Sequence, residues 1–326
     1  MAEQLALLPN YLTAHLQLSL LALLVSTAVS IPLGIAATRS HWLEQPTLAL
    51  ASVIQTVPSL ALLAVMVPVL ASLGFQSIGF LPAFLGLTLY GLLPVLRNTV
   101  TGIAGVEPSI KEAARGVGMT RNQQLVLVEL PLAMPVIVAG VRTATVWIVG
   151  IATLSTPVGA TSLGNYIFSG LQTRNYISIL VGCVAAAALA LLLDSLVRQL
   201  ENGLVHKQRG RTVAALTVLV ILYGYATLTL TAPRTANQER PVVIGSKTFT
   251  EQYILSQTIA KWIERETNRS TELIQSLGSI VAFDALDSNE IDIYVDYTGT
   301  LWANEMERGN IQMNRADTLD GVRNFL

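Results

Sequence analysis

The residue types that most often carry chemistry are sparse in this chain, and their spacing excludes several common sites. One short run, Gly245-Ser246-Lys247-Thr248, is similar in sequence to the end of a phosphate-binding loop. However, Pro241 occupies the position at which that loop requires its first glycine. The three histidines are scattered, and Cys183 is the single cysteine, within an apolar run. Metal-ligand spacing and a second thiol are both lacking. The sequence therefore predicts no catalytic residue, no metal site, no cofactor and no ATP site.

A polar loop between two apolar segments carries a more informative pattern. Glu112-Ala113-Ala114 is followed after three residues by Gly118, and after eleven more by Leu130-Pro131. The two small alanine side chains allow a short helix to enter a groove on a partner, and the glycine allows a bend without a Cβ penalty. Residues 121–128 can form a second short helix, and the proline suits the opening of the next membrane helix. An ordinary solvated loop is the alternative, but the combined spacing favours a docking element.

The composition places most of the chain in a lipid bilayer. Of its 326 residues, 52% are hydrophobic and only 13% are charged, whereas soluble domains have about 25% charged residues. The net charge of −1 gives no reason to expect nucleic acid as a partner. The first eight residues lack a basic segment and a cleavage site, so we expect no removable signal peptide.

Six segments are apolar and long enough to cross a hydrocarbon core of about 30 Å as helices. They are Leu16–Ala37, Leu48–Leu70, Phe80–Ala104, Leu132–Leu154, Ile177–Leu200 and Val213–Leu230. Lys and Arg follow the first, third and fifth of these spans, whereas residues 71–78 have none and residues 155–176 have only Arg174. By the positive-inside rule, the N-terminus faces out, the Gly118 loop faces the cytoplasm and the tail faces out. Arg97 and Arg142, near span ends, either snorkel to the interface or take part in gating.

The tail has the pattern of a soluble α/β unit after a polar, proline-bounded linker. A buried strand is followed by an expected capping box of Thr248 and Glu251, which opens a helix that runs to Arg265. A second strand, a short helix and a third strand complete a βαβαβ pattern. The expected strands are Val242–Gly245, Thr271–Gln275 and Ile291–Val295, and the short helix is Ile280–Leu286.

The Gly118 loop resembles the EAA loop of bacterial ABC importer permeases. Other short runs in the apolar part resemble the permeases of the glycine betaine, choline and carnitine uptake family: Ile31-Pro32-Leu33-Gly34, Gln55-Thr56-Val57-Pro58-Ser59, Arg97-Asn98-Thr99 and Leu163-Gly164. The resemblance implies a separate ABC ATPase subunit as a partner and two permease copies, a homodimer, around one pathway. The implied ATPase-coupling residues are Glu112, Ala113, Ala114, Gly118, Leu130 and Pro131.

The tail resembles the opening lobe of substrate-binding proteins for the same amines. The resemblance lies in residues 245–252 and 294–300, with Leu277-Gly278-Ser279 and Glu290-Ile291-Asp292 between them. A permease followed by a binding domain is similar to the fused members of the family. Their binding domain is a two-lobed clamp, and residues 241–326 fall short of the ~150–250 residues of a full α/β receptor. We therefore expect a fragment or a natural truncation, and a ligand site that this chain alone does not complete.

The ligand class that the resemblance implies has a simple recognition chemistry. A quaternary ammonium donates no hydrogen bonds and is bound by aromatic faces, for which Tyr297 is the best candidate. A ligand carboxylate would favour the helix N-terminus near Thr250–Gln252. The implied ligand residues are Ser246, Phe249, Thr250, Gln252, Tyr297, Thr298 and Gly299.

These inferences predict a mostly α fold: a polytopic membrane helix bundle of the MetI-like ABC permease type, then the first part of an α/β periplasmic-binding-protein-like lobe. The expected location is the bacterial inner membrane. The expected parts are a permease domain at 1–211 with five helices and its coupling loop at 107–131, a tethering sixth helix at 212–231, a linker at 232–240 and the partial receptor at 241–326.

Two other classes of function remain open at this point. A membrane-anchored receptor or sensor would need no coupling loop and no ATPase partner, and a gated channel would transport without ATP. The identity of the amine is also open, since glycine betaine, choline, carnitine and an ergothioneine-like betaine all fit.

Overall fold

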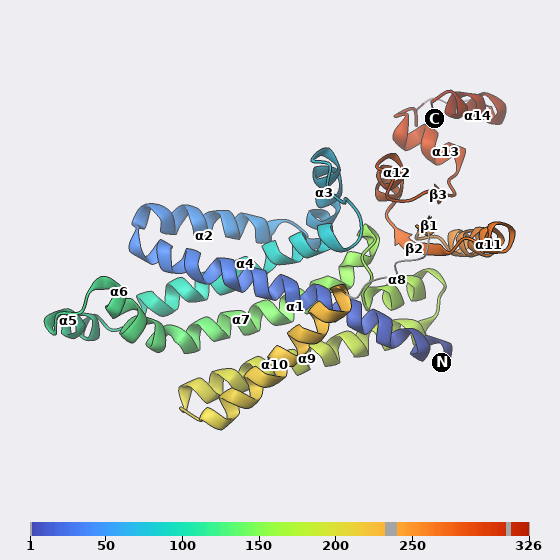
Figure 1. Ribbon diagram of the computed structural model, residues 1–326. Coiled ribbons are helices and arrows are strands. Elements are labelled where there is room, and N and C mark those ends of the chain that lie inside the picture. Colours follow the sequence, from blue (N-terminus) through green and yellow to red (C-terminus); the bar gives the residue numbers. More distant parts are fainter. Residues whose placement is uncertain (1, 232–239, 311–313, 326) are drawn as a thin grey trace.

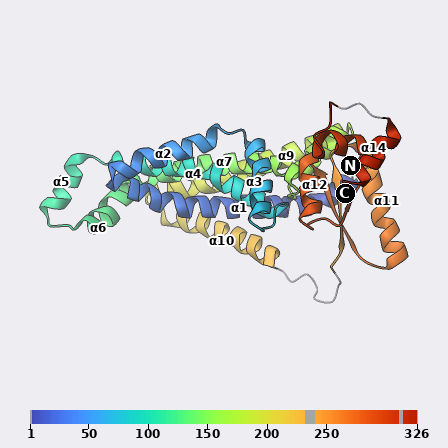
Figure 2. The ribbon, with the colours of Figure 1, turned by 90° about the horizontal axis from the view of Figure 1, so that it is seen from above.

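The computed structural model describes residues 2–231, 240–310 and 314–325, in which a long helix bundle carries a small α/β lobe at one end (Figure 1). Two short helices, α5 (Pro108–Gly116) and α6 (Arg121–Gln124), form the opposite tip. The view from above shows the same arrangement, with the lobe and the tip at the two ends of the bundle (Figure 2). The expected order of a membrane bundle followed by an α/β unit is confirmed.

Five helices in the described part of the chain are long and apolar enough to cross a membrane, or six if one bent pair counts as a span. A helix pairs most of its backbone polar groups internally, which is what allows it to cross a bilayer. The single-helix candidates include α1 (Ala2–Arg39), α4 (Phe80–Ala104), α7 (Leu130–Ala152), α9 (Tyr176–Val205) and α10 (Arg209–Thr231). A multi-pass membrane protein is thus confirmed.

The second expected span is not one straight helix. It is divided into α2 (His41–Thr56) and α3 (Ser59–Ser72), which meet at an angle of 101°. Val57 has φ −70° and ψ 129°, an extended conformation. The following Pro58 disfavours the helical conformation in the residue before it, which explains why the helix ends there.

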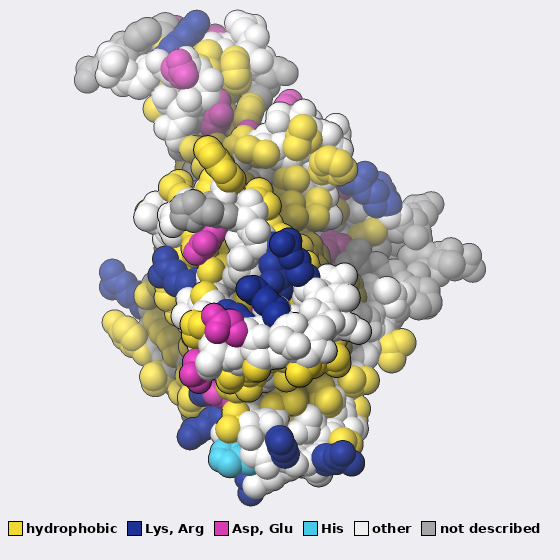
Figure 3. Space-filling model, turned by 90° about the vertical axis from the view of Figure 1, so that its left-hand side faces the viewer, with side chains coloured by type: hydrophobic (Ala, Val, Ile, Leu, Met, Phe, Trp, Pro, Cys, Tyr) yellow, Lys and Arg dark blue, Asp and Glu magenta, His cyan; other side chains and the backbone are white. Residues whose placement is uncertain are grey.

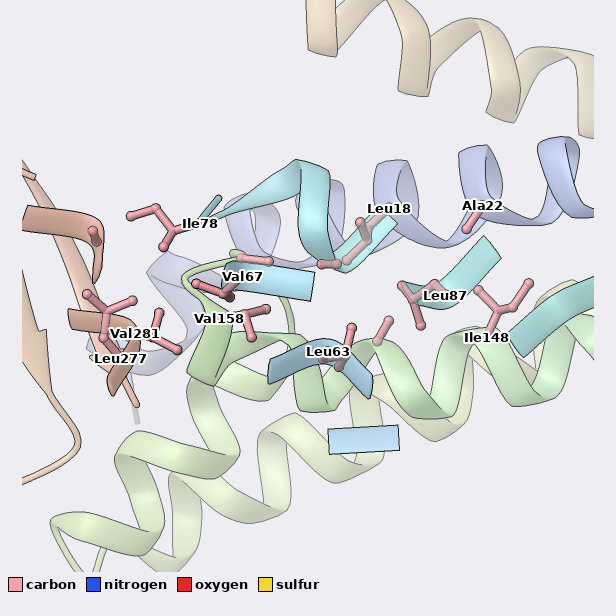
Figure 4. Close-up of a cluster of buried hydrophobic side chains, with 14 of the residues drawn as sticks. Leu18, Ala22, Leu63, Val67, Ile78, Leu87, Ile148, Val158, Leu277 and Val281 are labelled. Carbon is pink, nitrogen blue, oxygen red and sulfur yellow. The ribbon is translucent and has the colours of Figure 1, made fainter. Parts of the chain in front are cut away.

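Close approach of backbones holds the centre of the bundle together. A Cβ atom on Gly140 of α7 would lie 2.7 Å from the carbonyl oxygen of Pro94 on α4, a distance that only glycine tolerates. The buried side chains of Leu18 on α1, Leu87 on α4 and Ile148 on α7 fill the space between these three helices (Figure 4).

Polar contacts attach further elements to this centre. The buried His15 of α1 joins its Nε2 to the Val149 carbonyl oxygen at 3.1 Å, and its Nδ1 accepts from the Leu163 N–H at 3.3 Å. Leu163 directly precedes α8 (Gly164–Gln172), which lies beyond the short 3-10 helix at Thr153–Val158. Helix α10 packs on α1, where Gln17 donates to Thr229 Oγ1 at 2.8 Å.

The lobe has a parallel three-stranded sheet with the order β2-β1-β3. Helix α11 connects β1 to β2, and α12 connects β2 to β3, so the βαβαβ pattern is confirmed. A further helical segment follows the sheet. The bounds are β1 (Val242–Lys247), α11 (Thr250–Thr267), β2 (Thr271–Leu277), α12 (Ser279–Asp287), β3 (Ile293–Tyr294), α13 (Thr298–Thr300), a π-helical turn at Leu301–Glu305, and α14 (Arg315–Arg323).

Two local predictions in the lobe are wrong. The capping box of Thr248 and Glu251 does not form: Phe249 occupies the N-cap position of α11 and makes no side-chain cap. The Glu251 carboxylate instead accepts a hydrogen bond from Tyr297. The third strand has only two residues, because the chain leaves the sheet directly after Tyr294.

Candidate functional site

The Gly118 loop is built from two short helices at the tip of the bundle. Helix α5 starts at Pro108, which suits a first helical turn, and ends at Gly116. Gly118 has a φ of +84°, in the left-handed region that favours glycine, so the expected bend is present. Thr120 then caps α6: its hydroxyl accepts from the Gln123 backbone N–H, and its own N–H donates to Gln123 Oε1 at 2.9 Å.

The six residues that the sequence singled out in this loop do not all face the same way. Ala114 is only 5% exposed, and α5 contacts the chain's own π-helical turn. Only the other alanine therefore offers a small side chain to a partner. Glu112, Ala113, Gly118 and Pro131 are exposed, and Leu130 is half-buried.

Pro131 lies in the first turn of α7, as expected, but the membrane helix is not separate from the helical turns before it. The helix runs without a break from Arg121 to Val158, because a π-helical turn at Leu125–Glu129 joins α6 to α7. Proline has no N–H for the usual bond to the carbonyl four residues back. The wider π-helical turn just before it accommodates that loss. The second half of the loop is therefore one piece with a membrane span.

A buried polar network that the sequence analysis missed ties this loop to α1. Glu129 is 2% exposed, and its Oε2 accepts from Arg39 Nη2 at 2.8 Å. Its other oxygen accepts from Gln124 Nε2 at 2.6 Å, and Gln124 Oε1 accepts in turn from Arg115 Nε at 3.3 Å. The sequence did contain a sign of this network: Glu129 is the single charged residue in the apolar run 125–132. A charge buried in such a run requires a partner.

The outer face of the tip carries both apolar and charged side chains. Val117 is 75% exposed and Leu127 is 63% exposed. Lys and Arg side chains, with some acidic ones among them, are visible at this end of the molecule (Figure 3). The tip thus combines exposed apolar side chains with charged ones, among them Lys111, Arg115 and Arg121.

In the lobe, the expected ligand residues lie at or just after the carboxyl ends of β1 and β3. This is the edge of an α/β sheet at which ligands usually bind. A buried ion pair, which the sequence analysis also missed, links two of the strand ends. Lys247 Nζ lies 2.5 Å from Asp296 Oδ2, and both side chains are nearly inaccessible. Tyr294 Oη donates to the same carboxylate oxygen at 3.1 Å, and burial together with Asp296 raises the pKa of Tyr294.

Two buried polar side chains near this edge have no hydrogen-bond partner in the described part of the chain. They are the Ser246 hydroxyl, on β1, and the Gln252 amide nitrogen, in the first turn of α11. Unsatisfied buried polar atoms are uncommon and often mark a place where a ligand or water binds. Both residues belong to the set expected from the sequence.

The aromatic members of that set are accessible. Phe249 is 45% exposed and Tyr297 is 50% exposed. The Tyr297 hydroxyl donates to Glu251 Oε1 at 3.0 Å, and this hydrogen bond raises the Tyr297 pKa. Thr298 and Gly299 follow it in α13.

Thr250 has a different contact from the rest of the expected ligand set. Its hydroxyl donates to the Gln172 carbonyl oxygen, at the end of α8, at 2.9 Å. It therefore joins the lobe to the membrane bundle.

Known protein families match both parts of the chain. Residues 30–206 match the family described as "Binding-protein-dependent transport system inner membrane component". Residues 240–319 match "Substrate binding domain of ABC-type glycine betaine transport system".

Two relatives represent the unfused and the fused arrangement. The chain is 40% identical over 193 residues to the glycine betaine/carnitine/choline transport system permease protein OpuCB of Bacillus subtilis, covering 59% of this chain and 86% of that protein. It is 34% identical over 265 residues to the ergothioneine transport permease/ergothioneine binding protein EgtU of Helicobacter pylori. That match covers 77% of this chain, which spans 46%, about half, of the fused relative's length.

A solved structure has the same membrane fold. It is an inward-facing conformation of the MetNI methionine ABC transporter, with a TM-score of 0.58 and 20% identity, covering 63% of this chain and 99% of that one. At that identity the likeness concerns the fold alone. With the family match over more than half of its length, the chain belongs to the inner membrane components of binding-protein-dependent ABC transport systems.

Proposed function

We propose that the chain is the permease subunit of an ATP-driven ABC importer for small quaternary amines, with its receptor lobe tethered in the same chain. The observation that best supports this proposal is that two different sites lie at the two ends of one bundle. One is the tip with its bend at Gly118, and the other is an α/β lobe that matches the glycine betaine substrate-binding family. A sensor would have use for the lobe but not for the tip. A channel would have use for neither.

A separate ATPase subunit would dock on the tip. The exposed residues Glu112, Ala113 and Gly118, with the apolar side chains of Val117 and Leu127, form the contact surface in this proposal. Ala114, Leu130 and Pro131 would act by holding the shape of the loop rather than by touching the partner. Two copies of the permease would enclose one pathway, as a homodimer with two ATPase subunits.

The tip would lie in the cytoplasm, and the N-terminus and the lobe outside it. The basic side chains at the tip support this orientation, since Lys and Arg are enriched in cytoplasmic loops. A reporter that is active only outside the cytoplasm should work after Ser162 and fail after Thr120. Activity after Thr120 would reverse the orientation.

The quaternary amine would bind at the carboxyl edge of the lobe's sheet. Phe249 and Tyr297 offer accessible aromatic faces to a cation that donates no hydrogen bonds. The unpartnered Ser246 hydroxyl and Gln252 amide offer hydrogen bonds to an oxygen of the ligand. Thr298 and Gly299 complete the proposed set beside Tyr297.

One purification and one transport assay test the proposal. A tagged copy isolated from its native membranes should carry an ABC ATPase with it. Vesicles containing that complex should take up one labelled member of a panel of glycine betaine, choline, carnitine and ergothioneine only when ATP is present on the side of the tip. Absence of an ATPase together with binding of an amine would favour the sensor, and uptake without ATP would favour a channel.

A further inference from the structure

The lobe is seated on the membrane bundle rather than held only by its linker. Three buried apolar side chains of the lobe, Leu277, Val281 and Ile291, belong to one core cluster with Ile78 and Val158 of the bundle. Figure 4 shows Leu277 and Val281 facing the side chains of Ile78 and Val158. A shared core of this kind holds two parts together continuously, because separation would expose apolar surface on both.

A carboxylate of the lobe is held by backbone donors of the bundle. Glu290, which precedes β3, accepts from the N–H of Ser77 with Oε1 and from the N–H of Ile78 with Oε2, the latter at 3.0 Å. These two donors lie in the segment that enters α4. Hydrogen bonds to a charged acceptor are about twice as strong as neutral ones, so Glu290 is the strongest polar anchor of this interface.

A third contact joins the lobe to the end of the helix that carries the tip. The Gly278 N–H, between β2 and α12, donates to the Pro157 carbonyl oxygen at 2.9 Å. Pro157 belongs to the helical stretch that begins at Arg121 in the tip. The lobe therefore contacts one end of a single helix whose other end forms part of the coupling loop.

The linker favours a lobe that sits on its own copy. Eight residues separate Thr231 from Arg240, which limits their reach to roughly 30 Å. A short tether also gives a tethered site a high effective concentration. A lobe from a second copy would have to displace one that is already held nearby.

We infer that the lobe docks in cis, as a resident part of its own permease domain, with Glu290 as the anchoring residue and the segments at 77–78 and 157–160 as its seat. This inference rests on the proposed function only for calling the lobe a receptor. The docking contact itself requires neither ATP nor an amine.

Cross-linking in the full chain tests the docking directly. Gln76 of the bundle and Gln275 of the lobe both line a cavity of about 580 Å³ between the two parts. In a Cys183→Ala background, Gln76→Cys and Gln275→Cys in one chain should be joined by a bis-maleimide without added amine. After cleavage at a protease site inserted between Thr231 and Arg240, the lobe should stay covalently attached.

A co-expression arm separates docking in cis from docking in trans. Two differently tagged copies, each carrying one of the two cysteines, should give little cross-linked heterodimer. A heterodimer yield above that of the intramolecular product would overturn docking in cis. Absence of both products would overturn docking altogether, while leaving ATP-driven uptake to be judged by its own assay.

Two pairs of variants test the anchors. Glu290→Gln should lower the cross-linking yield about five-fold or more through loss of the charge, whereas Asp287→Asn, at an exposed position on α12, should not change it. Gly278→Pro fits the φ of −61° at that position but removes the N–H that Pro157 accepts. Gly278→Ala keeps that N–H and meets no atom closer than 3.5 Å. Equal yields within each pair would remove the anchoring roles.

Discussion

Arg39 at the end of α1 and Glu129 in the π-helical turn before α7 form an ion pair at 2.8 Å, in which the carboxylate is almost fully buried. Glu129 also accepts from Gln124, which contacts Arg115 of α5. The Gly118 loop is therefore attached to the first membrane helix as well as to α7, to which it is covalently continuous. In the proposed function, a movement of the loop would therefore act on two helices rather than one.

The first prediction concerns this attachment. Arg39→Ala leaves the Glu129 carboxylate buried without its cation, which should lower the free energy of unfolding by about 1–3 kcal/mol. Glu129→Gln should cost less, since its amide oxygen can still accept from Gln124. Thermal unfolding in lipid nanodiscs measures both. The control is Glu44→Gln, which should be nearly neutral; Glu44, Arg39 and Glu129 all line one cavity of about 240 Å³. Equal loss in all three variants would show that the ion pair has no special role.

The second prediction isolates backbone conformation in the loop. Gly116 and Gly118 both have open space where a Cβ would be placed, but only Gly118 has a positive φ, of +84°. Gly118→Ala should therefore cost about 1–2 kcal/mol locally, and Gly118→Val should cost more and abolish ATPase association while membrane insertion is kept. Gly116→Ala should be neutral or slightly stabilising, since it lies in a helix. Co-purification of the ATPase is the measurement, and normal association of Gly118→Val would remove the mechanical role of the bend.

The third prediction concerns the two arginines whose roles the sequence left open. Arg142 of α7 makes two hydrogen bonds to Asp194, at 3.0 and 3.2 Å, and one to Glu201 at 3.0 Å, both on α9. Arg97 reaches only Ser52 Oγ, at 3.4 Å, in the described part of the chain. Arg142→Ala should thus lower the unfolding temperature clearly, by the equivalent of about 2 kcal/mol or more, whereas Arg97→Ala should change it little. If both variants change the unfolding temperature only slightly, both arginines snorkel to the membrane interface and the ion pairs of Arg142 contribute little.

The elements of this fold were largely predictable because each depends on a local pattern. The membrane spans follow from apolar length, and the β1–α11–β2 order follows from alternating periods of hydrophobicity. The bend at Pro58 and the π-helical turn before Pro131 were missed, although both prolines were noted. Proline removes a hydrogen bond in every context, but whether the chain then breaks or widens its helix depends on packing against other elements.

The sites were predictable only in part, for a related reason. The bend at Gly118 was predicted from a local motif and is present, whereas the ligand role of Tyr297, also inferred from a local motif, stays a prediction. The Arg39–Glu129 and Lys247–Asp296 ion pairs join residues far apart in sequence, so no local spacing predicts them. The docking of Glu290 on Ile78 depends on how two separately folded parts meet, which hydrophobic periodicity does not encode.

The last prediction concerns the amine. Tyr297 presents half of its surface at the carboxyl edge of the sheet, and its hydroxyl is engaged by Glu251. If its ring face contacts a quaternary ammonium, Tyr297→Ala should weaken binding by about 1–2 kcal/mol, roughly ten-fold, and Tyr297→Phe should largely retain it. The matched control is Tyr294→Phe, which keeps its ring but loses the hydrogen bond to Asp296. Calorimetry on a version of the protein with a complete two-lobed receptor measures all three, and unchanged affinity in Tyr297→Ala would place the aromatic contact on another residue, with Phe249 as the next to test.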